Sequence, residues 1–559
     1  MMVSTLPPLK IALIVDSATV PHYTYELVQW AASQPGIALT HIIVQELPPA
    51  RRMTKIQRVR DIRKREGFKI LATRMLWALI VRLEEYRLRH RVTDRHFAPK
   101  DVSGMVPNIL RVTPEISKSG FVYRYAPADI ATIRAQEFDV LLRCGSGILR
   151  GDILTAARFG ILSFHHGDNR VNRGGPPAFW EVFYHMPTTG FIIQQLTDEL
   201  DGGHVLFRGS FPTQRYWLAN QAHLYERSNY YMKHVLAKIA ATHALPMAEE
   251  PVLYCDRLFK APALDAQLQY LLGFVTAKLS HIWSYQLRRR RQRWSVAYTR
   301  SGWKNLVMWK GKRIPNPPGR FLADPFVIAR DGKDYCFVED YSYATQRGSI
   351  SVYELGAEAT LLGEVVAEPF HLSFPYMFEH GGTLYMVPES AKNNDIRLYE
   401  CTEFPLQWRL KRVLMENVSA ADSMIFAHGG KWWMFTNINP LGDSDHCSEL
   451  YAFYTDDPIN GAWTAHAANP LIIDPACARN GGILFDAQSI YRVAQRQGFI
   501  QYGAGASIRR IAVLDTERYE EHVIRTIEPN FFEGLIGTHH LHSNGTVTAF
   551  DFVEHSMLS

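Results

Sequence analysis

The second half of the chain repeats one β-hairpin pattern five times, and this repeat restricts the fold more than any other feature of the sequence. In each copy an apolar strand, a short turn and a second apolar strand follow one another, at intervals of roughly 49 to 58 residues. The copies begin at Phe321, Leu372, Ala421, Arg479 and Gly537. Four-stranded blades of a β-propeller have this spacing. The pattern predicts a five-bladed β-propeller over about residues 295–559.

Length and composition limit the remaining choices. A chain of 559 residues is long enough for two or three domains. Its net charge of +6 is too small for this length to indicate a nucleic-acid-binding protein. The six cysteines show neither Cys-x-x-Cys pairs nor metal-ligand spacing, which favours free thiols in the cytoplasm and predicts no metal site. No secretory signal precedes the first predicted strand, Lys10–Val15.

The first half of the chain predicts a doubly wound α/β domain. Buried strands at 10–15 and 39–45 flank a helix at 24–33. Farther on, the apolar run 138–142 leads into Cys144-Gly-Ser-Gly147, and the next strand ends in a polar tip that contains His165. Open α/β sheets carry their chemistry beyond the carboxyl ends of the strands. We therefore expect an acyl-transfer site at this edge.

The motifs around that tip resemble a known family. The chain reads Gly160-Ile-Leu-Ser-Phe-His-His-Gly-Asp-Asn169, then Arg173-Gly-Gly-Pro-Pro177, Thr188-Thr-Gly190 and Leu200-Asp-Gly-Gly203. Over roughly residues 8–215 this is similar to the 10-formyltetrahydrofolate-dependent formyltransferases, which carry Gly-x-x-Asn-x-His-x-Ser, Arg-Gly-x-x-Pro, Thr-Gly and Leu-Asp-x-Gly.

The resemblance implies catalytic roles for His165, Asp201 and Ser163. Ser163 stands where the family has asparagine, and His166-Gly167 replaces the usual Pro-Ser. Loss of an oxyanion donor costs about 100- to 1,000-fold in rate, although a serine hydroxyl can still donate one hydrogen bond. The alternative is a degenerate domain that keeps only the fold.

The resemblance also implies 10-formyltetrahydrofolate as the formyl donor. The residues expected to bind it are Cys144, Gly145, Ser146, Gly147 and Arg173.

Two basic segments interrupt this organisation. Residues 51–95 predict a helical insertion in the α/β domain at 1–245, and residues 246–294 predict a helical linker, with a helix from Ala263 to Trp294 whose end is polybasic. Neither segment is apolar enough to span a bilayer. Both suit peripheral contact with an anionic membrane surface, or, alternatively, packing within the protein.

The start of each inner propeller strand predicts which side chains enter the central funnel. The opening Ala-Asp-Pro-Phe resembles the five-bladed arabinanase, xylosidase and invertase type of glycoside hydrolase. His371-Leu-Ser-Phe-Pro375, Tyr385-Met-Val-Pro-Glu-Ser390 and Arg479-Asn-Gly-Gly482 resemble the N-terminal domain of plant glucosamine inositolphosphorylceramide transferases. The predicted funnel residues are Asp324, Glu339, Glu389, Asp422, Arg479 and Gln495. They predict either a carbohydrate-binding funnel or a carboxylate pair that cleaves or transfers glycosides; the alternative is that the carboxylates only bond turn amides.

Together the two halves predict an enzyme that N-formylates an amino sugar, nucleotide- or lipid-linked, in surface glycan assembly. The propeller would bind or process the glycan, and the protein would act in the cytoplasm, with peripheral contact at the inner membrane face. Two alternatives remain open: a glycoside hydrolase or transglycosylase, and a glycan-binding scaffold without catalytic activity.

Overall fold

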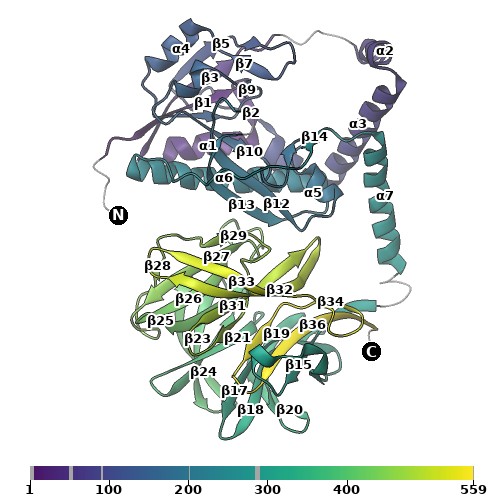
Figure 1. The fold of residues 1–559 in the computed structure, drawn as a ribbon, viewed down its shortest axis with the longest axis vertical. Coiled ribbons are helices and arrows are strands. Elements are labelled where there is room, and N and C mark those ends of the chain that lie inside the picture. Colours follow the sequence, from purple (N-terminus) through teal and green to yellow (C-terminus); the bar gives the residue numbers. More distant parts are fainter. Residues whose placement is uncertain (1–5, 49–53, 90–91, 200–201, 284–289, 558–559) are drawn as a thin grey trace. The chain divides into compact units, whose positions relative to one another are not determined.

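The computed structural model describes residues 6–48, 54–89, 92–199, 202–283 and 290–557. The chain divides into two compact units, Met1–Val275 and Thr276–Ser559. The first unit is α/β and the second is built from β-strands (Figure 1). The fold class predicted from the sequence is confirmed in both units.

One mixed sheet forms the centre of the first unit. Its order, among the described residues, is β13-β12-β10-β8-β1-β3-β5; β12 is antiparallel to both of its neighbours, β10 and β13, and the other neighbouring strands pair in parallel. The strands are β1 (Leu9–Val15), β3 (Ile37–Gln45), β5 (Asn108–Val112), β8 (Val140–Arg143), β10 (Ile161–His165), β12 (Thr188–Gln195) and β13 (His204–Pro212). Six of the seven residues of β1 are buried, as expected for a central parallel strand covered on both faces.

Helices and short strands complete the α/β unit. The helices other than the basic ones are α1 (His22–Ser33), α4 (Pro127–Arg134), α5 (Phe179–Phe183) and α6 (Trp217–Thr242). The short strands are β2 (Thr19–Pro21) with β4 (Pro99–Asp101); β6 (Glu115–Ile116), β7 (Val122–Arg124) and β9 (Ile148–Leu149); and β11 (Arg173–Gly174) with β14 (Leu258–Phe259). The long helix α6 buries Leu224, Leu236 and Ile239 completely, which fixes it to the domain.

The basic insertion forms two helices, α2 (Lys55–Glu66) and α3 (Phe68–Leu88). Thr54 and Gln57 form a capping box at the start of α2, and Gly67, with φ of 89°, separates the helices. In the part of the chain that the structure describes, no helix has the length and apolar character needed to cross a membrane.

The predicted helix from Ala263 to Trp294 is wrong at its C-terminal end. Helix α7 covers Leu264–His281, and Arg290–Trp294 lies in the strand β15 (Arg290–Thr299). Strand β15 pairs along its whole length with β36 (Thr548–Met557). Pairing with a strand more than 250 residues away in sequence therefore overrides the local helical pattern.

The second unit is the predicted five-bladed propeller. Its described strands form five successive sheets, which are β17 (Arg320–Arg330), β18 (Lys333–Ser342), β19 (Arg347–Leu355) and β20 (Ala359–Val366); β21 (Ser373–His380), β22 (Thr383–Glu389), β23 (Asp395–Glu403) and β24 (Gln407–Glu416); β25 (Ala420–His428), β26 (Lys431–Ile438), β27 (Glu449–Thr455), β28 (Thr464–Ala465) and β29 (Ile472–Ile473); β30 (Asn480–Phe485), β31 (Ile490–Gly498), β32 (Gln501–Leu514) and β33 (Tyr519–Ile527); and β15, β16 (Lys312–Ile314), β34 (Leu535–Gly537), β35 (Leu541–Ser543) and β36.

The fifth blade joins the two ends of this unit, because β15 and β16 come before the first blade and β34–β36 follow the fourth. The inner strands β17, β21, β25, β30 and β35 contact one another in this order, and β35 contacts β17. The ring is thus closed by strand pairing rather than left with a free edge.

Candidate functional site

The first four inner strands of the propeller bulge at the same level. The ladder shifts between Ala323 and Phe326, Ser373 and Tyr376, Ala421 and Met424, and Asn480 and Ile483. The bulges hold Asp324-Pro325, Phe374-Pro375, Asp422-Ser423 and Gly481-Gly482. A bulge re-aims side chains and accommodates proline in a strand, so this repeated irregularity gathers polar groups from different blades at one level of the ring.

The first bulge residue takes a left-handed conformation in three blades, with φ of 49° at Asp324, 46° at Phe374 and 50° at Asp422. In the fourth blade the corresponding residue is Gly481, where an added Cβ would lie 2.1 Å from the His539 carbonyl oxygen. Glycine therefore permits the close approach of the fourth and fifth blades.

An ion-pair cluster joins the second, third and fourth blades. Arg479 Nε donates to Asp422 Oδ2 at 2.7 Å, and Arg479 Nη2 donates to Glu389 Oε2 at 3.3 Å. Gln495 Nε2 also donates to Asp422 Oδ2, at 3.0 Å. The structure thus brings together Glu389, Asp422, Arg479 and Gln495, four of the six predicted funnel residues.

A second cluster lies between the first and fifth blades. His539 Nδ1 is 2.5 Å from Asp551 Oδ2, and His539 Nε2 is 3.8 Å from Asp324 Oδ1. Asp551 Oδ1 also accepts the backbone N–H groups of His539 and His540, at 3.0 Å each. Asp551 is therefore the carboxylate that bonds turn amides, whereas Asp324 Oδ1 is buried without a hydrogen-bond partner.

Burial changes the protonation of the funnel carboxyls. It raises the pKa of Asp324 to about 7, although the charge of His539 opposes the shift, and it raises the pKa of Asp422 to about 7 against the effect of Arg479. Burial, followed by the negative charges of Asp324 and Glu389, raises the pKa of Glu339 well above its usual range. Near neutral pH the funnel therefore holds protonated as well as ionised carboxyls.

The funnel residues predicted from the sequence did not include His539, His540 or Asp551. These residues come from the Thr538-His-His-Leu-His542 run and the final strand, and a histidine-rich strand start is the one signal that could have indicated them. Asp324, His539 and Asp551 carry ligand atoms within 4.8 Å of one another, a spacing that could hold a cation. The 2.5 Å contact of His539 with Asp551 is an ion pair that accounts for this pair of residues without a bound cation.

Aromatic side chains accompany both clusters. The Arg479 guanidinium lies 5.1 Å from the centre of the Tyr502 ring, and Tyr502 is 39% exposed. Trp294 stacks on His539 with ring centres 4.1 Å apart. An exposed aromatic ring beside an arginine and carboxylates is a combination that suits the apolar face and the hydroxyls of a sugar.

The α/β unit places its polar residues at adjacent strand ends. Ser163 of β10 and Arg143 of β8 are register partners. Arg143 Nη1 donates to Ser163 Oγ at 3.4 Å, and the serine hydroxyl donates to the Phe164 carbonyl at 3.0 Å. The serine hydroxyl thus already donates its proton to a backbone carbonyl. The charged donor next to it is Arg143, whose Nε has no hydrogen-bond partner.

The predicted donor-binding loop follows β8 directly. Ser146 N–H donates to the Asp16 carboxylate at 2.9 and 3.0 Å, and added Cβ atoms at Gly145 and Gly147 would meet Gln45 at 2.7 Å and Tyr123 at 2.4 Å. Burial raises the pKa of the Cys144 thiol to about 12, so it remains protonated. The two glycines let the loop pass close to β1, β3 and β7.

His165 ends β10, half-buried, with Nε2 3.5 Å from the Asn172 carbonyl oxygen. Asn172 Nδ2 donates to the buried Glu181 at 3.2 Å, while Asn172 Oδ1 and Glu181 Oε2 have no hydrogen-bond partner. Arg173 Nε donates to the Asn169 carbonyl at 3.0 Å, and its guanidinium lies over Tyr254. Asp201 lies outside the described residues.

Unpartnered polar atoms therefore surround the ends of β8 and β10, on Arg143, Asn172 and Glu181. Polar ligand groups could satisfy them, so the residue set fits a polar acyl donor and its acceptor. A half-buried histidine can move a proton, and the Arg143 guanidinium near Ser163 can stabilise an oxygen that becomes negative.

Part of the second unit is similar to a described family. Residues 308–532 match the family "Glucosamine inositolphosphorylceramide transferase 1, N-terminal". The protein of that name from Oryza sativa subsp. japonica is 34% identical over 210 residues, which are 36% of this chain and 28% of the relative. The chain thus spans little more than a quarter of the length of that relative.

Other comparisons give lower sequence identities. The methionyl-tRNA formyltransferase of Bacillus mycoides is 22% identical over 211 residues, 35% of this chain and 63% of the relative. Among solved structures, the family 117 glycoside hydrolase Zg3597 of Zobellia galactanivorans has a TM-score of 0.33 at 10% identity, covering 48% of this chain and 91% of that one. Glycinamide ribonucleotide transformylase 1 of Symbiobacterium toebii has a TM-score of 0.24 at 12% identity, covering 42% and 86%.

Proposed function

We propose that the chain is a transferase of glycan assembly, in which the α/β unit moves a formyl group from 10-formyltetrahydrofolate to an amino sugar and the propeller funnel binds the saccharide. The observation that carries the proposal is the funnel itself. Arg479 and Gln495 hold Asp422 beside Glu389 at one level of the ring, under the exposed Tyr502. Relatives of this unit carry the name of a glucosamine-containing substrate.

In this reaction 10-formyltetrahydrofolate supplies an electrophilic formyl carbon, and the chain supplies proton transfer and charge stabilisation. His165 would take the proton of the attacking amine and deliver it to the leaving nitrogen. Arg143 would stabilise the oxygen that becomes negative, as the charged donor nearest to Ser163. Asp201 would orient His165, and Arg173 with the loop Cys144–Gly147 would contact the donor.

The same proposal includes contact with an anionic membrane through α2 and α3. Phe68, Met75, Leu79, Leu83 and Tyr86 are 74, 61, 49, 52 and 88% exposed. Their spacing places them on one stripe of a 3.6-residue helix.

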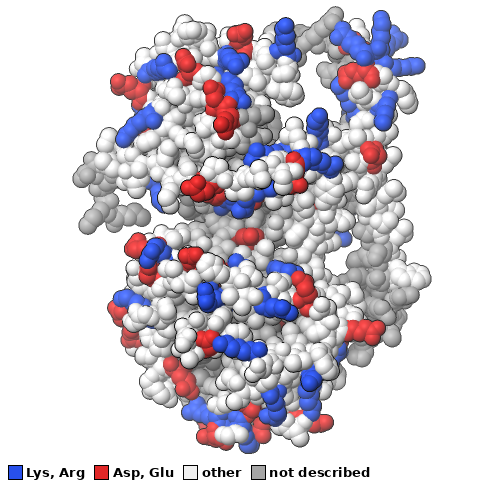
Figure 2. Space-filling view, viewed as in Figure 1, with Lys and Arg blue, Asp and Glu red and all other residues white. Residues whose placement is uncertain are grey.

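The preceding helix α2 is rich in basic residues, and Figure 2 shows Lys and Arg side chains crowded over it. An exposed apolar stripe next to cations suits the interface of a bilayer with negative headgroups. A second copy of the chain would instead bring like charges together, which favours the lipid surface.

The membrane part is tested by flotation of the whole protein with vesicles of phosphatidylcholine, with and without phosphatidylserine. We expect binding only with the anionic lipid, and its loss in a Met75→Glu, Leu79→Glu double variant. Exchange of the exposed Ala78 for glutamate is the matched control for adding charge to the same helix. Equal flotation of wild type and the double variant would remove the stripe from the proposal.

The transfer itself is tested by incubating the protein with 10-formyltetrahydrofolate and a panel of nucleotide-linked amino sugars. Mass spectrometry should find a product that has gained one formyl group, and His165→Ala should abolish it. Absence of any formylated product with wild-type protein across amino sugars and amino-sugar lipids would overturn this function.

A second candidate function is glycoside hydrolysis or transglycosylation in the funnel. It is favoured by the raised pKa values of Asp324, Asp422 and Glu339, because glycosidic cleavage needs one protonated and one ionised carboxyl. Release of sugar from an aryl glycoside panel, abolished by Asp324→Asn but retained by His165→Ala, would support this function over a binding role for the propeller.

A further inference from the structure

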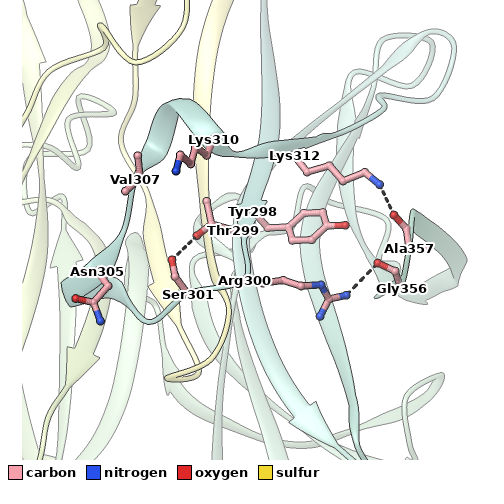
Figure 3. Close-up of a pocket in the computed structure, with 10 residues that line it drawn as sticks. All are labelled: Tyr298, Thr299, Arg300, Ser301, Asn305, Val307, Lys310, Lys312, Gly356 and Ala357. Atoms are coloured by element: carbon pink, nitrogen blue, oxygen red, sulfur yellow. Dashed lines mark hydrogen bonds between the residues drawn. The ribbon is translucent and has the colours of Figure 1, made fainter.

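A pocket of about 510 Å³ lies outside the funnel, where the end of β15 meets the turn between β19 and β20 (Figure 3). Arg300, Lys310 and Lys312 contribute to its wall together with the turn Gly356–Ala357. None of the described residues that line it carries a carboxylate. The volume falls within the range of ordinary small-molecule sites.

The pocket and the funnel are at opposite ends of the first blade. Glu339 pairs with Ala323, next to Asp324, in the half of the β17–β18 ladder that begins with the Arg320–Ser342 pair. At the other end Tyr335 pairs with Ile328 and with Glu354, just before the Gly356–Ala357 turn. A ligand in this pocket is therefore separate from a sugar in the funnel.

The cations of the pocket are held mainly by neutral groups. Arg300 Nη2 donates to the carbonyls of Leu355 and Gly356 at 2.5 and 3.0 Å, and Lys312 donates to the Ala357 carbonyl. Lys310 lies 5.3 Å from the centre of the Trp309 ring. A carbonyl orients a cation without cancelling its charge.

Among the described residues, one carboxylate pairs with these three cations: Asp334 Oδ2 lies 3.3 Å from Arg300 Nη1. The pocket thus keeps an excess of positive charge.

Tyr298 supplies an independent sign of a ligand. Its ring is packed in the core between the fifth and first blades and is 3% exposed, yet its buried hydroxyl has no hydrogen-bond partner. Figure 3 shows this hydroxyl pointing between Arg300 and Lys312. A buried hydroxyl without a partner is unfavourable, and an acceptor oxygen of a ligand would satisfy it.

We propose that this pocket binds a phosphate group, with Tyr298 Oη, Arg300 and Lys312 as donors to its oxygens. Phosphate offers several acceptor oxygens and negative charge, which matches the two cations beside this hydroxyl, whereas Lys310 lies on the other side of the pocket, toward Val307 (Figure 3). The volume leaves room for the group to which the phosphate is attached. The phosphate belongs either to a soluble sugar phosphate or to a lipid headgroup, and this site goes beyond the proposed transferase function.

The test is calorimetric titration of the whole protein with inorganic phosphate and with glucose 1-phosphate, with uncharged glucose as reference. Vesicles of phosphatidylcholine with phosphatidylinositol form the lipid arm. We expect Lys312→Ala to weaken phosphate binding about tenfold, the loss of one charge-assisted contact. Lys333→Ala is the matched control, because Lys333 lies on the same blade, is exposed and pairs with Glu354.

Tyr298→Phe separates ligand binding from a structural role. Removal of an unpartnered hydroxyl should leave the melting temperature in phosphate-free buffer unchanged or higher, and weaken phosphate binding about fivefold. A lower melting temperature with unchanged affinity would overturn the assignment.

The arms also distinguish the two sources. Binding of glucose 1-phosphate and inorganic phosphate without binding of the vesicles supports a sugar phosphate, and vesicle binding that falls in Lys312→Ala but not in Lys333→Ala supports a lipid headgroup. Equal effects of Lys312→Ala and Lys333→Ala, or no binding of any phosphate compound, would refute the site.

Discussion

The edge of the α/β sheet and the propeller funnel gather polar residues in different ways. At the sheet edge, Arg143, Ser163 and His165 come from two adjacent strands within about 20 residues of sequence. In the funnel, Asp324, Glu389, Asp422 and Arg479 come from four blades, each placed by the same bulge or its hairpin partner. At the sheet edge, a side chain on the adjacent strand can therefore replace a missing hydrogen-bond donor. The funnel cluster instead requires that the bulges of several blades stay in register.

The largest expected effect is on the sheet edge. Exchange of His165 for alanine should lower the rate of formyl transfer by about 100- to 10,000-fold, because a positioned acid–base group is lost. Transfer to the best amino sugar is measured by mass spectrometry, with His204→Ala, at the exposed start of β13, as the control. More than a tenth of the wild-type rate in His165→Ala would contradict the role.

In the funnel, Arg479→Met should lower the free energy of unfolding by about 3–5 kcal/mol at pH 8, since Asp422 would remain buried without its cation. Urea unfolding measures the effect. Arg496→Met in the same blade removes a surface pair with Glu528 and should change stability by at most about 1 kcal/mol. Similar losses of unfolding free energy in both variants would mean that the Arg479–Asp422 pair stabilises the fold no more than a surface ion pair does.

Arg143→Gln tests whether the sheet edge has replaced its missing donor. We expect kcat/KM for transfer to fall about 100-fold, the loss typical of one oxyanion donor. Guanidinium added to Arg143→Ala should restore part of the rate. An unchanged rate in Arg143→Gln would mean that Ser163 or backbone amides, rather than Arg143, donate to the oxygen that becomes negative.

The pH dependence of stability probes the funnel carboxyls. The folded pKa of Asp324, about 7, lies above its ordinary value of 3.8, so the native state binds the proton more tightly than the unfolded chain. Its contribution to stability is therefore present at acid pH and falls as pH rises from about 4 through about 7. Asparagine cannot ionise, so Asp324→Asn should lack this loss of stability. The free energy of unfolding of the variant minus that of wild type should therefore be about 2 kcal/mol larger at pH 8 than at pH 5.

Chemical unfolding at the two pH values checks this expectation. Asp331→Asn, on the β17–β18 turn, serves as the control because asparagine tolerates its φ of 52°. A parallel pH profile for wild type and Asp324→Asn would show that the buried carboxyl is not the titrating group.

The smallest expected effect is that of Ser163→Ala. The serine hydroxyl donates to the Phe164 carbonyl rather than toward an acceptor substrate, so transfer should change by less than about threefold, well below the loss expected for an oxyanion donor. Steady-state kinetics with the best amino sugar measure it. A 100-fold loss would make Ser163 the donor after all and would set aside the role of Arg143.

Sequence alone predicted much of this architecture, because both domains are built from patterns that repeat within short windows. Hairpins at nearly constant spacing indicated the blades, and the apolar run before Cys144 indicated the strand that leads to the sheet edge. Asp324 and Asp422 could be assigned to the funnel because each begins an inner strand. The sequence could not show that Asp324 Oδ1 lacks a hydrogen-bond partner while Asp551 bonds the turn amides, since these residues are 227 positions apart.

What the sequence determined by itself is the periodicity: which segments alternate as strands, which repeat as blades and where polar residues follow buried runs. The tertiary structure decided which of those residues meet and what charge they carry. Arg290–Trp294 became a strand because β36 pairs with it, and Arg143 took its place beside Ser163 because β8 and β10 are in register. Burial in the closed ring, a property of five blades together, raises the pKa of Asp324 and Asp422, because desolvation depends on all surrounding atoms rather than on neighbours in the chain.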